Sequence, residues 1–400
     1  MSDNLPRVVL KPRRAQPFFY RHPWVFDGAI QRVEGDPQVG DEAVLVTEKG
    51  DPVARGLFNP RSNIKLRLYG WDVARPLDDA FFAERIDHAI ALRERLFPAW
   101  TESSAGRLIF SEGDHLSGLT VDRYGDWLAV QFTSAALAVR KDAILRRLRD
   151  RLKPRGIVLR TEKGIGEAEG LELDDGLAAG VEPPRPLFIE EHGLRYGVDL
   201  LEGQKTGFFL DQRDNRRAAA RYLSGGRVLD LFCYSGGFGL TALAAGGARQ
   251  VVGVDVSEAA VALAAENARL NGLDAKTEYH AKPAFEALED FAAAGERFDA
   301  VILDPPKMTR TRHTIDKALK GYYSLNKLAV DLLPPGGILV TCSCSGLIGR
   351  DDFEQVLTTV AMRTGRPIQV LEARGPAADH PVSISCPESN YLKCYICRVS

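Results

Sequence analysis

Residues 228–239 read VLDLFCYSGGFG, an apolar run that ends in a glycine-spaced turn. The run predicts an inner strand, and the glycines allow the backbone to bend tightly beside a ligand. A second apolar run, QVVGVDVS at 250–257, places Asp255 at its carboxyl end. In an open α/β sheet, ligands bind beyond the carboxyl ends of the strands, where an acid can accept hydrogen bonds from both ribose hydroxyls. The two runs therefore predict a nucleotide-type ligand at the edge of a sheet.

The C-terminal half of the chain continues this alternation. Strands are expected at 228–232, 251–255, 299–303 and 337–342, with helices such as 257–271 between them. This rhythm predicts an α/β fold with a parallel, helix-flanked sheet. Nicotinamide enzymes share the logic but carry G-x-G-x-x-G, whereas this turn reads YSGGFG. The spacing resembles motif I of class I S-adenosylmethionine (SAM) methyltransferases, with Asp255 as the motif II acid; other nucleotide binders and plain strand–turn packing are the alternatives.

Composition limits the class of protein. A chain of 400 residues predicts two or three domains. The net charge of −2 excludes a globally basic nucleic-acid binder but leaves room for a local basic groove. No run of 18 apolar residues occurs, and the N-terminus lacks the apolar core of a signal peptide, so we expect a cytoplasmic protein without membrane contact. Six cysteines do not form a secreted disulfide framework.

Three regions differ in pattern, and we expect domains at 1–75, 76–200 and 201–400. Residues 1–75 contain short strand-like runs broken by Pro, Gly and Asp, enough for a small β-barrel. The middle region mixes a helix at 81–97, a hairpin at 118–132 that turns at Gly125-Asp126, a second helix over roughly 138–152 and a strand at 156–163. LFIEEHGLRYGVDL predicts another hairpin, which turns at His192-Gly193. The middle domain is therefore expected to be α+β.

The strand FDAVIL runs directly into Asp304-Pro305-Pro306-Lys307. A residue before a proline is pushed to extended geometry, so Asp304 is held stiffly at the strand's carboxyl end, where a methyl donor would present its methyl group. The alternative is a strand that simply ends at Asp-Pro. Methyltransferases that modify exocyclic amines usually carry an aromatic residue after the two prolines, and Lys307 here argues against amine chemistry.

The next strand, GGILVT, ends in Cys342-Ser343-Cys344-Ser345-Gly346. Cytosine carbon 5 is not nucleophilic enough to take a methyl group unaided. A thiolate that adds to carbon 6 activates it, and a carboxyl group such as that of Asp304 can stabilise the charge that develops at ring nitrogen 3. Two buried core thiols are the plain alternative.

Two further sequence features bear on metal binding and on RNA contact. Cys394 and Cys397 have a chelating spacing, but YLKCYICRV reads as a strand, on which residues three apart face opposite sides; we therefore expect no metal site. The segment 307–320, KMTRTRHTIDKALK, carries five Lys or Arg against one acid. It is either a solvated loop or a loop that contacts RNA phosphates or gates the substrate.

Together these motifs resemble the ribosomal RNA large subunit methyltransferase I family over nearly the whole chain. HPWVFDGAI is similar to its N-terminal PUA domain, GLTVDRYGDWLAVQ and IEEHG to its central domain, and GQKTGFFLDQRDNR, DLFCYSGGFG, LDPPK, SCSG and DHPV…YLK follow in family order. The resemblance implies an N-terminal PUA β-barrel, a central EEHG domain and a Rossmann-like catalytic domain. It also implies SAM as the cofactor, 5-methylcytosine formation in 23S rRNA, large-subunit rRNA as the partner, and a homodimer.

The resemblance also implies a set of site residues. The SCSG match makes Cys344 the nucleophile, with Asp304 assisting, and Cys342 becomes an extra thiol. Gln212 and Arg213 become partners of the SAM methionine carboxylate, with capping and packing as the alternative. The other expected cofactor contacts are Asp230, Phe232, Tyr234, Ser235, Gly236, Gly237, Asp255 and Pro305.

Two positions depart from the family pattern. Lys282-Pro283 stands where an acid usually accepts from the adenine amino group, so adenine recognition must use another group. Lys307 stands where many RNA cytosine-5 enzymes carry a second cysteine for product release, which leaves that step to Cys342 or to another residue. The alternatives are a guanine-N7 methyltransferase of the same fold, which needs no thiol, and a non-catalytic RNA-binding assembly factor.

Overall fold

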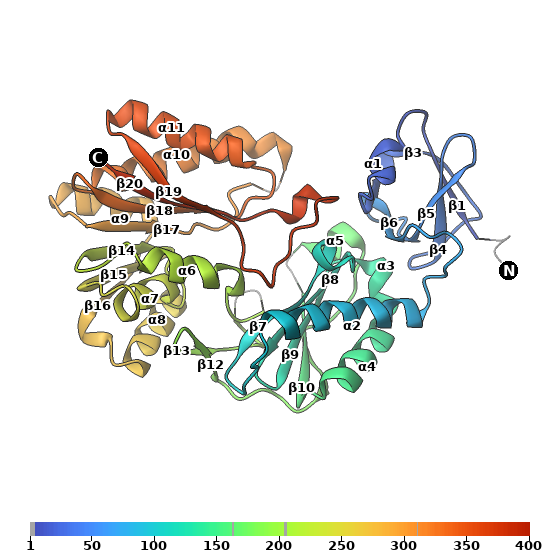
Figure 1. Ribbon diagram of the computed structural model, residues 1–400, viewed down its shortest axis with the longest axis horizontal. Helices are drawn as coiled ribbons and strands as arrows, with labels where there is room; N and C mark the ends of the chain where they lie inside the picture. Colours follow the sequence, from blue (N-terminus) through green and yellow to red (C-terminus); the bar gives the residue numbers. More distant parts are fainter. Residues whose placement is uncertain (1–4, 162–163, 204–205, 310) are drawn as a thin grey trace. The chain divides into compact units, whose positions relative to one another are not determined.

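The computed structural model describes residues 5–161, 164–203, 206–309 and 311–400, coloured along the chain in Figure 1. The chain packs as two compact units. Unit 1 contains the chain up to Leu187 together with Val198–Phe208 and Ala378–Ser389, and unit 2 contains Phe188–Gly197, Phe209–Ala377 and Asn390–Ser400. Gln204 and Lys205 of the predicted GQKTGFFLDQR segment and Arg310 of the basic segment lie outside the described residues. The expected division into three domains, at 1–75, 76–200 and 201–400, stays a prediction.

Unit 1 begins with a six-stranded sheet in the order β2-β6-β5-β4-β1-β3. Only β1 and β4 pair in parallel; the other neighbours are antiparallel. Its inward side chains, such as Val8, Leu45 and Leu66, form one apolar core. The elements are β1 (Arg7–Leu10), α1 (Gln16–Phe19), β2 (Trp24–Phe26), β3 (Ile30–Glu34), β4 (Glu42–Val46), β5 (Pro52–Phe58) and β6 (Ile64–Gly70).

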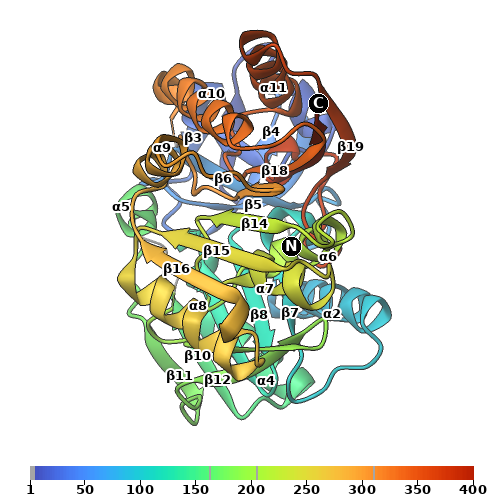
Figure 2. The same cartoon turned by 90° about the vertical axis from the view of Figure 1, so that its left-hand side faces the viewer.

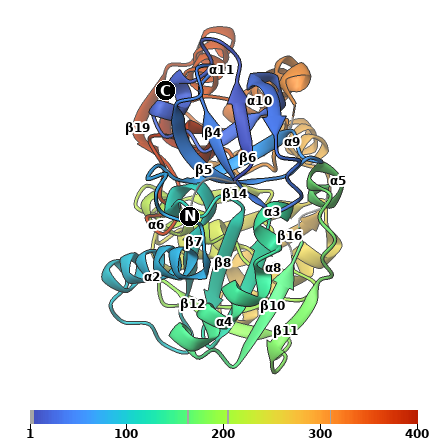
Figure 3. The same ribbon diagram turned by 90° about the vertical axis from the view of Figure 1, so that its right-hand side faces the viewer.

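A second sheet of unit 1 has five strands in the order β11-β10-β9-β8-β7, and α2 and α4 pack against each other beside it (Figure 3). The predicted hairpin turn at Gly125-Asp126 is confirmed, because Tyr124 pairs with Trp127. The helix expected over roughly 138–152 is α4, which begins three residues later, at Lys141, and a short helix, α3, precedes it. The elements are α2 (Asp79–Leu96), β7 (Ala105–Phe110), β8 (Leu119–Tyr124), β9 (Trp127–Phe132), α3 (Ala135–Ala138), α4 (Lys141–Leu152), β10 (Gly156–Arg160), α5 (Ile165–Glu169) and β11 (Gly176–Gly180).

Unit 2 carries the hairpin of β12 (Leu187–Glu191) and β13 (Leu194–Val198) and a seven-stranded sheet. The hairpin turns at His192 and Gly193, both with positive φ, as predicted. The buried Arg216 guanidinium pairs with Glu191 at 2.7 Å and holds the hairpin beside α6. The EEHG motif therefore anchors its hairpin to unit 2.

The seven-stranded sheet has the order β16-β15-β14-β17-β18-β20-β19 (Figures 1 and 2). The first five strands are parallel, and β20 runs antiparallel to both of its neighbours. The predicted α/β class is thereby confirmed. The strands are β14 (Arg227–Leu231), β15 (Gln250–Asp255), β16 (Thr277–Ala281), β17 (Ala300–Leu303), β18 (Gly337–Ser343), β19 (Ile368–Arg374) and β20 (Lys393–Val399).

Helices cover both faces of this sheet because its inner strands are apolar on both sides. Helices α6 and α7 pack on one core, and α9, α10 and α11 pack on the other. The helices are α6 (Arg213–Ala220), α7 (Gly237–Ala244), α8 (Glu258–Leu270), α9 (Ala284–Ala293), α10 (Ile315–Asp331) and α11 (Arg350–Thr364). Short 3-10 turns occupy Asp27–Ala29, Ser111–Asp114, Leu210–Gln212, Asp274–Lys276, Arg312–Thr314 and Pro387–Ser389.

The topology fixes where a ligand can bind. Strand order reverses beside β14, which lies between β15 and β17. In parallel sheets such a switch point opens a crevice beyond the carboxyl ends of the strands. Asp255, Asp304 and Cys344 lie at or just beyond the ends of β15, β17 and β18, so they share that edge.

Candidate active site

The turn after β14 bends through unusual backbone conformations. Phe232, Tyr234 and Gly236 all have positive φ, at 63°, 46° and 79°. Two of these residues are not glycine, and the left-handed region costs them about 1–3 kcal/mol each. The turn is held by hydrogen bonds from the Cys233 amide to the Val254 carbonyl, at 3.1 Å, and from the Gly236 amide to the Cys233 carbonyl, at 2.8 Å. Such strain concentrates at binding sites, and the turn leads directly into α7.

Asp230 lies beneath this turn and is only 1% exposed. Its Oδ2 atom accepts a hydrogen bond from the Gly239 amide at 2.9 Å. A Cβ atom at Gly239 would lie 2.7 Å from Val251 Cγ1, so only glycine lets α7 approach the sheet this closely. Burial raises the pKa of Asp230 to about 7. Asp230 therefore supports the turn from inside the protein.

Asp255 joins the turn to the next strand. Its Oδ2 accepts from the Tyr234 amide and its Oδ1 from the Ser257 amide, both at 3.0 Å. Each carboxylate oxygen retains a second lone pair, so the residue can still accept from ribose hydroxyls. Lys282 follows β16 and forms an ion pair with Asp290 of α9. The expected adenine acid is thus replaced by a lysine that already has an acidic partner.

A chain of hydrogen bonds ends on Asp304. Gln212 Nε2 donates to Asp304 Oδ1 at 2.9 Å, and Asn215 Nδ2 donates to Gln212 Oε1 at 2.7 Å. Arg374 Nε in turn donates to Asn215 Oδ1 at 2.9 Å. This series of hydrogen bonds orients the Gln212 amide so that its N–H faces the Asp304 carboxyl group. No local sequence pattern indicates this hydrogen bond, because Gln212 and Asp304 are 92 positions apart.

The other residue of that predicted pair, Arg213, begins α6 and is 9% exposed. Its backbone carbonyl lies 3.1 Å from His192 Nε2 of the EEHG hairpin. Gln212 was expected to contact a methionine carboxylate, and the structure instead gives its amide two protein partners. The expected contacts of Gln212 and Arg213 with the SAM methionine carboxylate stay predictions.

Cys344 differs from the other cysteines. Five of the six are buried and Cys344 is partly exposed. Its Sγ donates to the Pro305 carbonyl at 3.6 Å, which joins the thiol to the segment that carries Asp304. Cys342 is fully buried in the core beside Cys394, and burial raises the pKa of its thiol. The structure therefore favours the packing role for Cys342 over product release.

The backbone around Cys344 is tied down on several sides. Ser345 Oγ accepts from the Met308 amide at 3.1 Å and lies 3.1 Å from Tyr322 Oη of α10. The Ser345 carbonyl accepts from Lys393 Nζ at 2.8 Å. Lys393 is 1% exposed. The YLK motif that contains this lysine is one of the family motifs in the sequence, but a motif does not indicate that the lysine is buried against the residue that follows the thiol.

Packing and hydrogen bonding account for two groups of ligand-type side chains. Cys394 and Cys397 line different cores, on the two faces of the sheet, as the strand pattern predicted. In unit 1, His22, Cys386 and Glu388 approach one another. His22 Nδ1 accepts from the Trp24 amide at 3.2 Å, which places the ring proton on Nε2, facing Glu388 at 3.3 Å. A protonated nitrogen has no lone pair for a metal, so hydrogen bonding accounts for this group.

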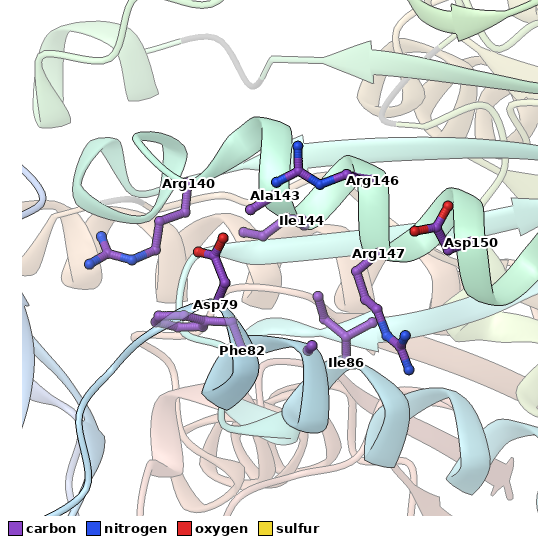
Figure 4. A pocket seen from close by; sticks show the side chains of 10 residues that line it. Asp79, Phe82, Ile86, Arg140, Ala143, Ile144, Arg146, Arg147 and Asp150 are labelled. Atoms are coloured by element: carbon purple, nitrogen blue, oxygen red, sulfur yellow. The ribbon is translucent and has the colours of Figure 1, made fainter.

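A pocket of 170 Å³ lies between α2 and α4 in unit 1 (Figure 4). It contains none of the predicted site residues. Two of its arginines already have protein partners: Arg147 pairs with Asp87, and Arg140 donates to the Gly40 carbonyl at 2.9 Å. The lining residues are Asp79, Phe82, Ala83, Ile86, Arg140, Ala143, Ile144, Arg146, Arg147 and Asp150. We assign it no ligand.

The basic segment after Asp304 carries exposed cations. Lys307, Arg312 and His313 all face solvent, whereas Thr309 is buried. Thr309 Oγ1 and Thr314 Oγ1 lie 2.7 Å apart and brace the segment internally. The side chains of Lys307 and Arg312 are therefore available to a polyanion.

Known proteins match the whole chain. A family model for S-adenosylmethionine-dependent methyltransferases matches residues 178–373, and a model for PUA-like domains matches residues 8–71. The chain is 40% identical over 405 residues to ribosomal RNA large subunit methyltransferase I of Klebsiella pneumoniae strain 342, with 100% of both chains covered. It is 41% identical over 401 residues to the protein of the same name from Salmonella arizonae, with 99% and 98% covered.

A solved SAM-dependent methyltransferase from Streptococcus mutans has the same fold, with a TM-score of 0.85 at 20% identity over 98% of this chain and 99% of that one. These matches confirm the predicted methyltransferase fold, the PUA-like domain and SAM as the cofactor. None of the helices that the described residues form has the length and apolar character needed to cross a lipid bilayer.

Proposed function

Because the chain belongs to the ribosomal RNA large subunit methyltransferase I family of SAM-dependent enzymes, we propose that it methylates carbon 5 of a cytosine in 23S ribosomal RNA. The observation that carries this chemistry is the partly exposed Cys344 thiol, 3.6 Å from the Pro305 carbonyl and so next to Asp304. A thiol and a carboxyl group at one strand edge are the two groups that cytosine activation requires.

The cofactor cradle is the turn after β14 together with Asp255. Tight backbone geometry at Gly236, the absent Cβ at Gly239 and the spare lone pairs of Asp255 fit a bound nucleoside. Asp255 accepts from the ribose hydroxyls, and Asp230 holds the turn from below. The backbone and side chains that line the cradle are those of Phe232, Tyr234, Ser235, Gly236, Gly237 and Pro305, with Arg213 toward the methionine carboxylate.

The reaction begins when the Cys344 sulfur attacks carbon 6 of the cytosine. The S–C6 bond forms, and the C5=C6 electron pair becomes available at carbon 5. Asp304 acts in its protonated form: with Oδ1 held by the Gln212 amide, its carboxyl O–H donates a hydrogen bond to ring nitrogen 3 and stabilises the negative charge that spreads there. SAM supplies an electrophilic methyl group. Once carbon 5 carries the methyl group, a base removes the carbon 5 proton, the C5=C6 bond re-forms and the thiolate leaves.

RNA contacts come from two regions. The exposed cations Lys307 and Arg312 lie on the segment that follows Asp304, where they can neutralise phosphates beside the target base. The PUA-like domain adds an RNA surface outside the catalytic sheet. The proposed homodimer stays a prediction, and sedimentation equilibrium of the purified chain checks it.

Mass spectrometry of rRNA from a strain that lacks the protein tests the function. Loss of one methyl group from one cytosine is expected, and complementation with the wild-type chain or with Cys342→Ala restores it. Cys344→Ala is expected to restore nothing. Methylation retained by Cys344→Ala would remove the thiol mechanism, and a methyl group lost from a guanine would support N7 chemistry. A purified chain that fails to bind SAM would support the non-catalytic alternative.

A further inference from the structure

We infer that Lys393 is a positioning residue that keeps the Cys344 sulfur in its thiolate form and fixes the backbone turn that carries it. This rests on the proposed function, in which that sulfur is the nucleophile. Lys393 is not one of the groups that touch the base or the methyl donor; it acts through Cys344.

Strand pairing places Lys393 at the end of the nucleophile's strand. In the antiparallel ladder of β18 and β20, Ser343 pairs with Lys393, and Cys344 is the next residue along the chain. The Lys393 side chain donates to the Ser345 carbonyl and to the Tyr391 carbonyl, both at 2.8 Å. The ammonium group therefore holds the carbonyl of the residue that directly follows the thiol.

Lys393 is a buried cation at the start of β20. A buried lysine is rare unless it is paired. Lys393 forms no ion pair with Asp or Glu in the part of the chain that the structure describes. Burial lowers the pKa of Lys393 to about 8, while the charge of Cys344 opposes that shift. A Cys344 thiolate thus stabilises the buried ammonium, and the ammonium stabilises the thiolate in return.

Other charged and titratable groups border this pair. Tyr322 on α10 stays neutral, because burial raises its pKa to about 12. Arg350 and Asp352 at the start of α11 act on the pKa of Lys393 in opposite directions, the first lowering it and the second raising it. A negative charge on Asp304 would disfavour a thiolate nearby. Lys393 is the buried cation that counters it.

The pH profile of Cys344 alkylation by iodoacetamide tests this inference without RNA or SAM. Peptide mass spectrometry follows labelling of Cys344 in the wild type, Lys393→Met, Lys393→Gln and Lys393→Arg, with Cys344→Ser as the blank. Gln keeps a donor for the two carbonyls but carries no charge, and Arg keeps the charge.

We expect Met and Gln to slow alkylation at pH 7 about tenfold, which corresponds to a profile displaced by about one pH unit, with rates that converge with the wild type above about pH 9. Arg should retain most of the wild-type rate. A Gln profile that superimposes on that of the wild type would overturn the inference, and circular dichroism identifies any variant that has lost its fold. If Met fails to fold, the Gln variant alone decides. If Cys344→Ala loses methylation while the alkylation profiles of the Lys393 variants match that of the wild type, the proposed function stands and the role of Lys393 is refuted.

Discussion

Replacing the buried acid beneath the glycine turn should change how stability depends on pH. The pKa of Asp230 is raised from 3.8 to about 7 by burial. The folded state therefore binds this proton more tightly than the unfolded state does. The wild type loses stability as the pH rises from about 4 to about 7, at about 1.4 kcal/mol per pH unit. Asn cannot ionise, keeps an oxygen for the Gly239 amide and should remove this loss.

The expected size follows from the same shift. Integrated between pH 5 and pH 7, the difference is about 2 kcal/mol, since the carboxyl group is already half ionised in the folded state near pH 7. For a unit of this size, each kcal/mol moves the melting temperature by about 2–4 °C. In the SAM-free protein, the melting temperature of Asp230→Asn minus that of the wild type should therefore rise by about 4–8 °C from pH 5 to pH 7. Differential scanning calorimetry measures both melting temperatures.

The exposed acid Asp274 provides the matched control, since Asp274→Asn should show the same pH dependence as the wild type. Equal differences in melting temperature at pH 5 and pH 7 for Asp230→Asn would refute the reasoning. They would mean that Asp230 is already ionised at pH 5 and that its burial is offset by partners other than the Gly239 amide.

Three further substitutions test the site. Gln212→Leu removes a hydrogen bond to the Asp304 carboxyl group worth about 1.5–3 kcal/mol, so the single-turnover methylation rate should fall about 10- to 100-fold with the SAM Kd unchanged. Gly239→Ala places a methyl group 2.7 Å from Val251 Cγ1 and should destabilise unit 2 by about 1–3 kcal/mol in urea unfolding. Asp255→Asn puts an amide where ribose hydroxyls need acceptors and should raise the SAM Kd about 10-fold or more by calorimetry.

Each of these has an outcome that would contradict it. A raised SAM Kd in Gln212→Leu would indicate that Gln212 contacts the methionine carboxylate of SAM. Gly28→Ala is the control for the glycine change, because nothing lies within 4 Å of its added Cβ; equal unfolding free energies for the two variants would refute the packing argument. An unchanged SAM Kd in Asp255→Asn would place the ribose elsewhere.

Local pattern predicted the sheet well. The strands that begin at Arg227, Gln250, Ala300 and Gly337 are apolar runs followed by turn residues, and such runs identify inner strands wherever they occur. The two hairpins were predicted because their turns need glycine. The helix expected over roughly 138–152 is present as Lys141–Leu152, so only its first residues were misplaced. Helix ends are less regular than helix interiors, and periodicity alone locates them poorly.

The site was predicted only in part, because several of its contacts join residues that are far apart in the sequence. Asp304 and Cys344 stand out because each follows a strand directly. The Gln212 amide and the Lys393 ammonium reach the site through pairings over 92 and 48 positions. A lysine in a sequence normally indicates a solvated side chain, and only the antiparallel ladder of β18 and β20 shows that this one is buried. Long-range contacts of this kind leave no local pattern.

The end of β18 decides which of two neighbouring cysteines can react. Cys342 and Cys344 are two positions apart, so on a continuing strand both would face the same core. The strand ends at Ser343. Cys342 therefore stays in the core beside Cys394, fully buried, whereas Cys344 leaves the sheet and turns its thiol toward the Pro305 carbonyl. Because the unprotonated sulfur is the reactive form and needs access, iodoacetamide should label Cys344 and spare Cys342 in the folded protein. Labelling of both at equal rates would show that the strand end does not separate them, and the assignment of the nucleophile would then lose its structural basis.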